Sequence, residues 1–144
     1  MRQNSPEGRA LQVQNGDVSI HVNIYGDPVK GEVSHYPVIL CVHGWPEHSH
    51  SWRHQVKFFV NHGYTVATMD VRGYGNSSKP DHVGGYTLES LALDVACVAA
   101  AVSDQPVVLF GHDGGGTDLL CHNLALSRVD LRRGRAKCTF YTLW

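Results

Sequence analysis

A buried strand that runs directly into a cluster of glycines is the feature that most restricts how this chain can fold. Residues 107–110 (Val-Val-Leu-Phe) are uninterruptedly apolar and continue into Gly-His-Asp-Gly-Gly-Gly at 111–116. A short continuous apolar run is typical of a strand covered on both faces of a sheet. Glycines then permit a turn too sharp for larger side chains. The pattern predicts Asp113 on a tight turn at the carboxyl end of this strand, with a helix continuing to about Leu126.

The preceding residues predict a mainly parallel sheet with an antiparallel hairpin at one edge. Residues 11–14 and 18–25 flank the turn sequence Asn15-Gly16-Asp17, and the second run has apolar residues at alternate positions. Residues 38–42 are continuously apolar, as expected of a strand covered on both faces, and residues 64–69 are predicted to form the next strand. Strands that alternate with helical patterns are typical of βαβ units and an α/β fold.

Two helices are predicted between the strands, one on each face of the sheet. Gly63 stands where the glycine that ends the first helix belongs, and Thr87 is suited to cap the second. The apolar stripes consist of Trp52, Val56, Phe59 and Val60 in the first helix and of Leu88, Leu91, Ala92, Val95, Ala99 and Val102 in the second.

Length and composition exclude several classes of protein. A chain of 144 residues with 42% hydrophobic and 17% charged residues is one globular domain's worth of sequence, not a disordered chain. No apolar run approaches the ~18–20 residues of a membrane span, and the polar start has no signal-peptide core, so we expect a cytoplasmic protein that does not contact membranes. The four cysteines lack a C-x-x-C pair, and the spacing of His48, His50 and His54 does not predict a metal site.

The end of the chain differs in charge from the rest. Residues 128–137 contain five of the 12 basic residues and one of the 13 acidic residues, so this stretch carries +4 and the remaining chain −5. We therefore divide the chain into a body, residues 1–127, and a basic then aromatic tail, residues 128–144. The tail is interpreted either as a sixth strand or as a C-terminus unrelated to the body. Without a nucleic-acid-binding motif, the basic run predicts no nucleic-acid partner.

The glycine-rich turn has the architecture of a nucleophile elbow, whose commoner form is Gly-x-Ser-x-Gly. Asp113 occupies the serine position. A carboxylate is already ionised at neutral pH, so it can displace a leaving group at an sp³ carbon and form an alkyl-enzyme ester. The alternative is a structural aspartate that caps a helix in a tight turn.

Together with two earlier motifs, this turn makes residues 10–127 resemble the epoxide hydrolases of the α/β-hydrolase superfamily. The motifs are His43-Gly44-Trp45-Pro46-Glu47 with Ser51-Trp52-Arg53, then Asp-Val-Arg-Gly-Tyr-Gly-Asn-Ser-Ser at 70–78, then Gly111-His112-Asp113. The resemblance implies a partial α/β-hydrolase fold and a small-molecule epoxide substrate, with no cofactor and no metal.

The resemblance also implies roles for individual residues. Asp113 is the nucleophile that opens the epoxide, and the backbone N–H groups of Trp45 and Gly114 form an oxyanion hole, where fixed donors await the developing charge. Residues expected to organise the surrounding loops are His43, Gly44, Pro46, Arg72, Gly111, His112 and Gly115.

The chain departs from related families next to the nucleophile. Haloalkane dehalogenases share the aspartate nucleophile, but they resemble one another in an Asn after the His-Gly pair and a Trp after the nucleophile. This chain has Trp45 and Gly114 at those positions, so epoxide opening is the preferred interpretation and haloalkane dehalogenation the alternative. Gly114 also departs from the Trp usual in epoxide hydrolases.

The second half of the family's catalytic machinery is missing from the sequence. Hydrolases of this kind place an acid and then a histidine after the nucleophile, but only 31 residues follow Asp113, with His122 as their single histidine. On a regular helix His122 points half a turn away from the elbow. We therefore expect a chain truncated before its catalytic base, alkylated once without turnover. The alternative from another class is a non-catalytic α/β module that associates through its open sheet edge.

Overall fold

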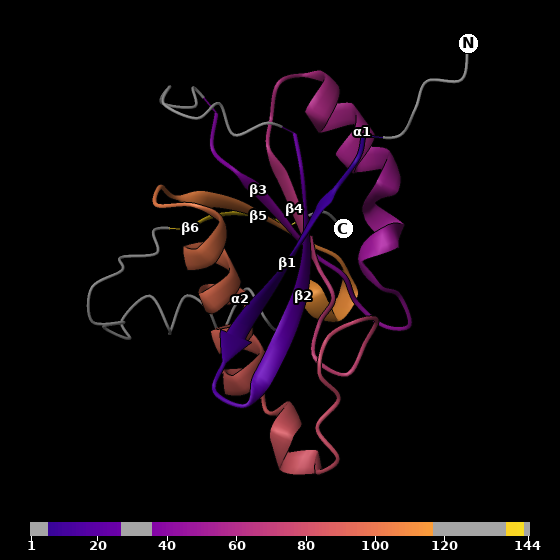
Figure 1. Ribbon diagram of the computed structural model, residues 1–144, viewed down its shortest axis with the longest axis vertical. Helices are drawn as coiled ribbons and strands as arrows, with labels where there is room; N and C mark the ends of the chain where they lie inside the picture. The colour runs from indigo at the N-terminus through magenta and orange to yellow at the C-terminus, as the bar shows by residue number, and fades with distance from the viewer. Residues whose placement is uncertain (1–5, 27–35, 117–137, 143–144) are drawn as a thin grey trace.

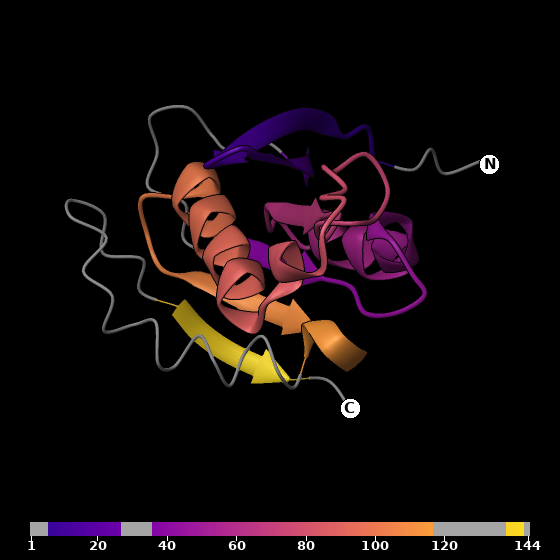
Figure 2. The same ribbon diagram turned by 90° about the horizontal axis from the view of Figure 1, so that it is seen from below.

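Across residues 6–26, 36–116 and 138–142, which the computed structural model describes, six strands form one mixed sheet with a helix on each face (Figures 1 and 2). Their order across the sheet is β1-β2-β4-β3-β5-β6. The strands are β1 (Arg9–Asn15), β2 (Val18–Tyr25), β3 (Ile39–Val42), β4 (Val66–Met69), β5 (Val107–Gly111) and β6 (Cys138–Thr142). The described helices are α1 (Arg53–Asn61) and α2 (Leu88–Val102), with short 3-10 turns η1 (Ser49–Trp52), η2 (Val83–Tyr86) and η3 (Asp113–Gly115).

The N-terminal hairpin forms the antiparallel edge that the sequence predicts. β1 and β2 pair around the turn with Asn15 opposite Val18, and Gly16 has a φ of +60°, which glycine adopts without strain. β2 then pairs antiparallel with β4, while β3 pairs in parallel with both β4 and β5. The predicted fold class, a mainly parallel α/β sheet with an antiparallel hairpin, is therefore confirmed.

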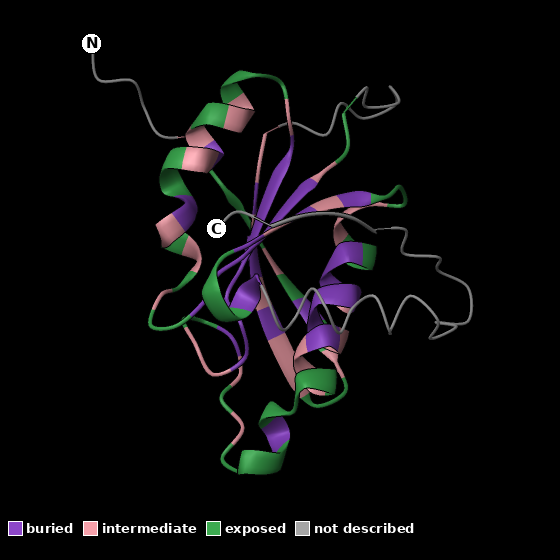
Figure 3. Cartoon of the chain, turned by 180° about the vertical axis from the view of Figure 1, so that it is seen from behind, coloured by how far each residue is buried: buried purple, intermediate pink, exposed green. Residues whose placement is uncertain are grey.

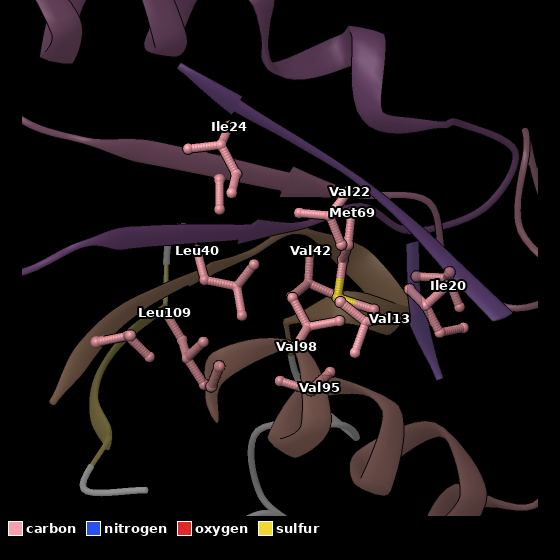
Figure 4. Close-up of a cluster of buried hydrophobic side chains, with 14 residues drawn as sticks. Val13, Ile20, Val22, Ile24, Leu40, Val42, Met69, Val95, Val98 and Leu109 are labelled. Atoms are coloured by element: carbon pink, nitrogen blue, oxygen red, sulfur yellow. The ribbon is translucent and has the colours of Figure 1, made fainter. Parts of the chain in front are cut away.

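The alternation of side chains along β3 divides the core into two clusters, one under each helix. Ile39 and Cys41 pack with Trp52 and Val56 from the η1–α1 segment. Leu40 and Val42 point to the other face and join the cluster shown in Figure 4, which includes Val95 and Val98 of α2. Figure 3 shows the central strands buried between these two layers. β3 is buried at every position because it is covered on both faces.

The ends of both helices follow the predicted signals. Gly63 follows α1 with a φ of +84°, and the Thr87 hydroxyl accepts a hydrogen bond from the Ser90 N–H at 3.2 Å at the start of α2. The prediction for Leu88 is wrong, because this first residue of α2 is 41% exposed. The helix contacts the core from Leu91, which is partly buried, and its fully buried residues begin at Ala92. Helical periodicity predicts the direction of a side chain, but not how far the sheet beneath it extends.

Three features of the remaining chain bear on the site. The 3-10 turn η2 lies in the connection between β4 and α2. β6 pairs in parallel with β5, so β5 is not an edge strand of the described sheet. The helix predicted up to Leu126 lies, beyond Gly116, outside the described residues.

No described helix is both long and apolar enough to cross a membrane.

Candidate active site

The candidate site lies where three parallel strands end in register. Val42 of β3 pairs with Met69 of β4 on one side and with Gly111 of β5 on the other. The loops that begin at His43, Asp70 and His112 therefore leave the same edge of the sheet. The carboxyl edge of a parallel sheet is where open α/β folds bind their ligands. Together with Gly111, the last residue of β5, these three loops contain every residue that the sequence predicts for the site.

Asp113 sits at the apex of a sharp turn after β5. Its φ of +52° lies in the left-handed region, which non-glycine residues seldom adopt and which concentrates at functional sites. The turn is closed by hydrogen bonds from the Gly115 N–H to the His112 carbonyl at 3.0 Å and from the Gly116 N–H to the Asp113 carbonyl at 2.8 Å. The backbone thus holds Asp113 in a strained conformation that directs it away from the strand.

Two glycines of this turn are required by close packing. A Cβ on Gly111 would overlap the Gly115 carbonyl oxygen. A Cβ on Gly115 would lie 2.6 Å from the carbonyl oxygen of His43, well inside any real contact. The turn therefore packs backbone against backbone, both on itself and on the end of β3.

The loop after β3 brings a backbone donor to the Asp113 carboxylate. The Trp45 N–H donates to Oδ2 of Asp113 at 3.0 Å. This approach requires Gly44, because a Cβ there would lie 2.5 Å from the Cβ of Asp113. Pro46 follows Trp45 and contributes no N–H. The two loops are therefore in direct contact at the predicted oxyanion donor.

The electrostatics of the turn favour an ionised Asp113. Hydrogen bonds from the backbone N–H groups of Gly114 and Trp45 lower the pKa of the carboxyl below its ordinary value, because they stabilise the charged form. The carboxylate is exposed, so water and small molecules reach it. An accessible carboxylate that is ionised at neutral pH and lies on a rigid turn is suited to act as a nucleophile.

His43 lies buried beneath this loop with both ring nitrogens engaged. Its Nε2 accepts a hydrogen bond from the Val71 N–H at 3.0 Å, and its Nδ1 lies 3.0 Å from the Gly44 carbonyl oxygen. Because a backbone N–H only donates, Nε2 is unprotonated and Nδ1 carries the proton, donating it to Gly44. Burial lowers the pKa of His43 and keeps the ring neutral. The imidazole thus ties the Gly44–Trp45 loop to the loop after β4.

Arg72 anchors the loop after β4 through a buried ion pair with Asp94. Nε and Nη2 of Arg72 donate to the two carboxylate oxygens of Asp94 at 2.6 and 2.7 Å, and Nη1 donates to the Gly85 carbonyl at 2.6 Å. The hydrogen bonds to Asp94 raise the pKa of Arg72. The Asn15 side chain also donates to Asp94 at 2.7 Å, which links the hairpin to the same pair.

Asp94 is a residue that sequence reasoning missed. Its position in the sequence indicates that it is buried. Asp94 lies on α2 three residues after Leu91 and directly before Val95, on the side of the helix that faces the core. A carboxylate at such a position is costly unless a cation pairs with it. Searching for that cation in neighbouring loops would have directed attention to Arg72.

Asp70 shapes the same loop from its other end. Its two carboxylate oxygens accept hydrogen bonds from the Ser49 N–H at 2.9 Å and the Asn76 N–H at 3.0 Å. Burial raises the pKa of Asp70, but these hydrogen bonds outweigh it and leave the pKa below its ordinary value. Ser77 donates to the Asp70 carbonyl at 2.5 Å and accepts from the His21 N–H at 2.8 Å, so the loop also docks on β2.

The remaining predicted residues lie at the rim of the site. Nδ1 of His112 is 3.7 Å from a carboxylate oxygen of Glu47, and both side chains are largely exposed. Apart from the neighbouring residues Asp113 and Gly115, a Cβ on Gly114 would have no heavy atom of the described chain within 4 Å. His122 and the acids Asp118 and Asp130 lie outside the described residues. Within the described ranges, no group of three His, Cys, Asp or Glu residues is placed to hold a metal ion.

Comparisons with known proteins agree on one family. A family model described as alpha/beta hydrolase fold matches residues 37–130. The chain is 41% identical over 80 residues to epoxide hydrolase 4 of Mus musculus and 39% identical over 79 residues to epoxide hydrolase A of Mycobacterium tuberculosis. The crystal structure of an epoxide hydrolase from Vigna radiata superposes with a TM-score of 0.71 at 27% identity, covering 97% of this chain.

The chain matches only part of each of these proteins. The alignments cover 56% and 55% of this chain, but 22% of the mouse protein and 24% of the mycobacterial protein. The superposition covers 40% of the Vigna radiata enzyme. The similarity therefore concerns the segment with the three loops, not the whole length of these relatives.

Proposed function

Because the chain belongs to the alpha/beta hydrolase fold family and is epoxide hydrolase-like, we propose that Asp113 is a nucleophile that opens epoxides. The observation that carries this proposal is the carboxylate on a positive-φ turn, with Oδ2 held by the Trp45 N–H at 3.0 Å. A helix-capping aspartate would not need a second loop to contact its carboxylate.

The first step forms an ester between Asp113 and the substrate. The carboxylate oxygen that does not face Trp45 attacks an epoxide carbon and forms a new C–O bond. The ring C–O bond at that carbon breaks, and its electron pair stays on the ring oxygen, which then takes a proton from water. The product is a 2-hydroxyalkyl ester of Asp113. Ring strain drives this step, so the protein needs only to present an ionised carboxylate in the correct direction.

The second step, hydrolysis of the ester, uses the other carboxylate oxygen. Oδ2 becomes the ester carbonyl oxygen, and attack by water places negative charge on it. The N–H groups of Trp45 and Gly114 are the donors that would stabilise this charge, and they need no rearrangement to do so.

Hydrolysis also needs a base to take a proton from the attacking water. Among the described histidines, His43 is unsuited because Val71 and Gly44 occupy both of its nitrogens. We propose that no other histidine takes this role, so that the chain is alkylated once at Asp113 and accumulates the ester.

Mass spectrometry of the purified chain tests this proposal. Incubation with 1,2-epoxypropane should increase the intact mass by one epoxide per chain. Hydroxylamine should release the adduct as propane-1,2-diol and leave a hydroxamate on Asp113, because it cleaves an ester but not a thioether or an alkylated imidazole. Asp113→Asn should abolish the labelling, and the exposed loop variant Asp104→Asn, as a matched control, should not.

Two results would contradict the proposal. Equal labelling of the wild type and the Asp113→Asn variant would assign the adduct to another residue. Sustained formation of diol in excess of the protein concentration would show that the ester does not accumulate.

A further inference from the structure

We propose that Gly114 sets the size of the epoxide substituent that reaches Asp113. The inference rests on the proposed function and adds to it a residue that determines specificity. Its basis is a contrast between Gly114 and the other glycines around the nucleophile.

Three of these glycines are required by the backbone packing of the site. A Cβ on Gly44 would lie 2.6 Å from the His112 carbonyl oxygen, and Cβ atoms on Gly111 and Gly115 would overlap backbone carbonyls. In each case the obstructing atom belongs to the backbone and cannot rotate away. These positions are glycine because the fold permits nothing larger.

Gly114 is free of both constraints that usually explain a glycine. Apart from its chain neighbours Asp113 and Gly115, a Cβ built there has no heavy atom of the described residues within 4 Å. Its φ also lies outside the left-handed region, unlike that of Asp113 before it, so an ordinary L-residue fits its backbone. Within the described part of the chain, the fold therefore gives no reason for the missing side chain.

Among the described residues, no side chain or distant backbone atom fills the space next to Gly114. Gly114 directly follows Asp113, so its Cα is about 3.8 Å from the Cα of the nucleophile. Gly114 is exposed, and its N–H group acts on the Asp113 carboxyl. Any side chain at this position would start one residue from the carboxylate, and we infer that it would restrict the approach of a substrate.

The other neighbour of the carboxylate is different. Trp45 donates its N–H to Asp113 and has a side chain that is 73% exposed. The nucleophile thus has a large aromatic residue in one flanking loop and no side chain at the next position of its own turn. This asymmetry fits an epoxide with one bulky substituent better than one with bulky groups on both carbons.

A pair of epoxides of similar chemical reactivity tests the inference. The rate constants for labelling Asp113 are measured by intact mass with 1,2-epoxypropane, which is small, and with cyclohexyloxirane, which is bulky. The wild type is compared with Gly114→Ala and Gly114→Trp. The ratio of the bulky to the small rate constant should fall at least about tenfold in Gly114→Trp, with Gly114→Ala between the two.

Thermal unfolding of the same proteins tests the structural premise without any chemistry. Gly114→Ala should unfold at the wild-type temperature or above it, whereas Gly115→Ala should unfold at a lower temperature. If the tryptophan variant does not fold, Gly114→Leu takes its place in the labelling experiment.

The outcomes separate the inference from the proposed function. A labelled wild type with a ratio unchanged within twofold in Gly114→Trp would overturn the inference and leave the nucleophile in place. Destabilisation of Gly114→Ala equal to that of Gly115→Ala would likewise overturn it. A wild type that neither epoxide labels at Asp113 would overturn both.

Discussion

Replacing Asp94 with asparagine should destabilise the fold by about 3–5 kcal/mol, because it leaves a buried guanidinium without its counter-charge. Arg72 and Asp94 are 5% and 1% exposed, and two hydrogen bonds of 2.6 and 2.7 Å join them. The substitution keeps the shape of the side chain but removes its charge and one acceptor oxygen. Since small domains are stable by about 5–15 kcal/mol, the loss is a large fraction of the total.

Urea unfolding followed by far-UV circular dichroism measures this loss. With a denaturant dependence of about 1–3 kcal/mol per molar urea, the midpoint should fall by at least about 1 M. Asp104→Asn makes the same chemical change at an exposed loop position and should stay within about 0.5 kcal/mol of the wild type.

The double variant Arg72→Met with Asp94→Leu separates the loss of the pair from the cost of an unpaired charge. Removing both charges should cost less than Asp94→Asn alone, because no buried ion is left behind. A loss below about 1 kcal/mol for Asp94→Asn would refute the reasoning, as would a double variant less stable than the single one.

Three further predictions concern the site. Because backbone N–H groups lower the pKa of Asp113, the rate constant for its labelling, followed by intact mass, should fall to half of its pH 8 value only below the ordinary aspartate pKa of about 3.9. A half-maximal rate constant near pH 6 would contradict this. The folded state holds His43 neutral, with its pKa below the ordinary 6.5, so the unfolded state binds more protons and stability should fall as the pH drops below about 6.5. Thermal unfolding across pH 5–8 should show that the unfolding temperature falls with pH, and this dependence should be weaker in His43→Gln. An equally strong pH dependence in the variant would show that a group other than His43 causes it. Gly44→Ala should slow the labelling of Asp113 at least about tenfold, because its Cβ would displace the nucleophile; labelling at the wild-type rate would show that the two loops are not in this contact.

Regular periodicity made most of the fold predictable from sequence. The hairpin around Asn15-Gly16-Asp17 and the strands β3 to β5 follow from apolar runs with clear turn signals. Gly63 and Thr87 mark helix ends because the backbone there needs a left-handed residue and a side-chain acceptor, which few residue types provide.

Long-range contacts were less predictable. No spacing rule connects Arg72 to Asp94, which lies 22 residues away and meets it only because α2 packs across the sheet. Leu88 is exposed for a similar reason, because burial depends on what the rest of the chain places opposite a side chain.

The candidate site was predictable where the chemistry restricts the residue type. Glycines 44, 111 and 115 leave no room for a Cβ, and an aspartate at the apex of the turn is already ionised. The geometry of the donors was not predictable in this way. The 3.0 Å contact from Trp45 to Asp113 joins residues 68 positions apart and depends on the register of β3 with β5.

The central claim is that Asp113 attacks an epoxide carbon, and its most direct test is the location of the adduct. The wild-type chain is incubated with 1,2-epoxypropane and digested, and the peptides are fragmented in a mass spectrometer. The added mass should lie on Asp113 alone, at one epoxide per chain. An adduct on a cysteine, a histidine or another carboxylate, with Asp113 unmodified, would contradict the account.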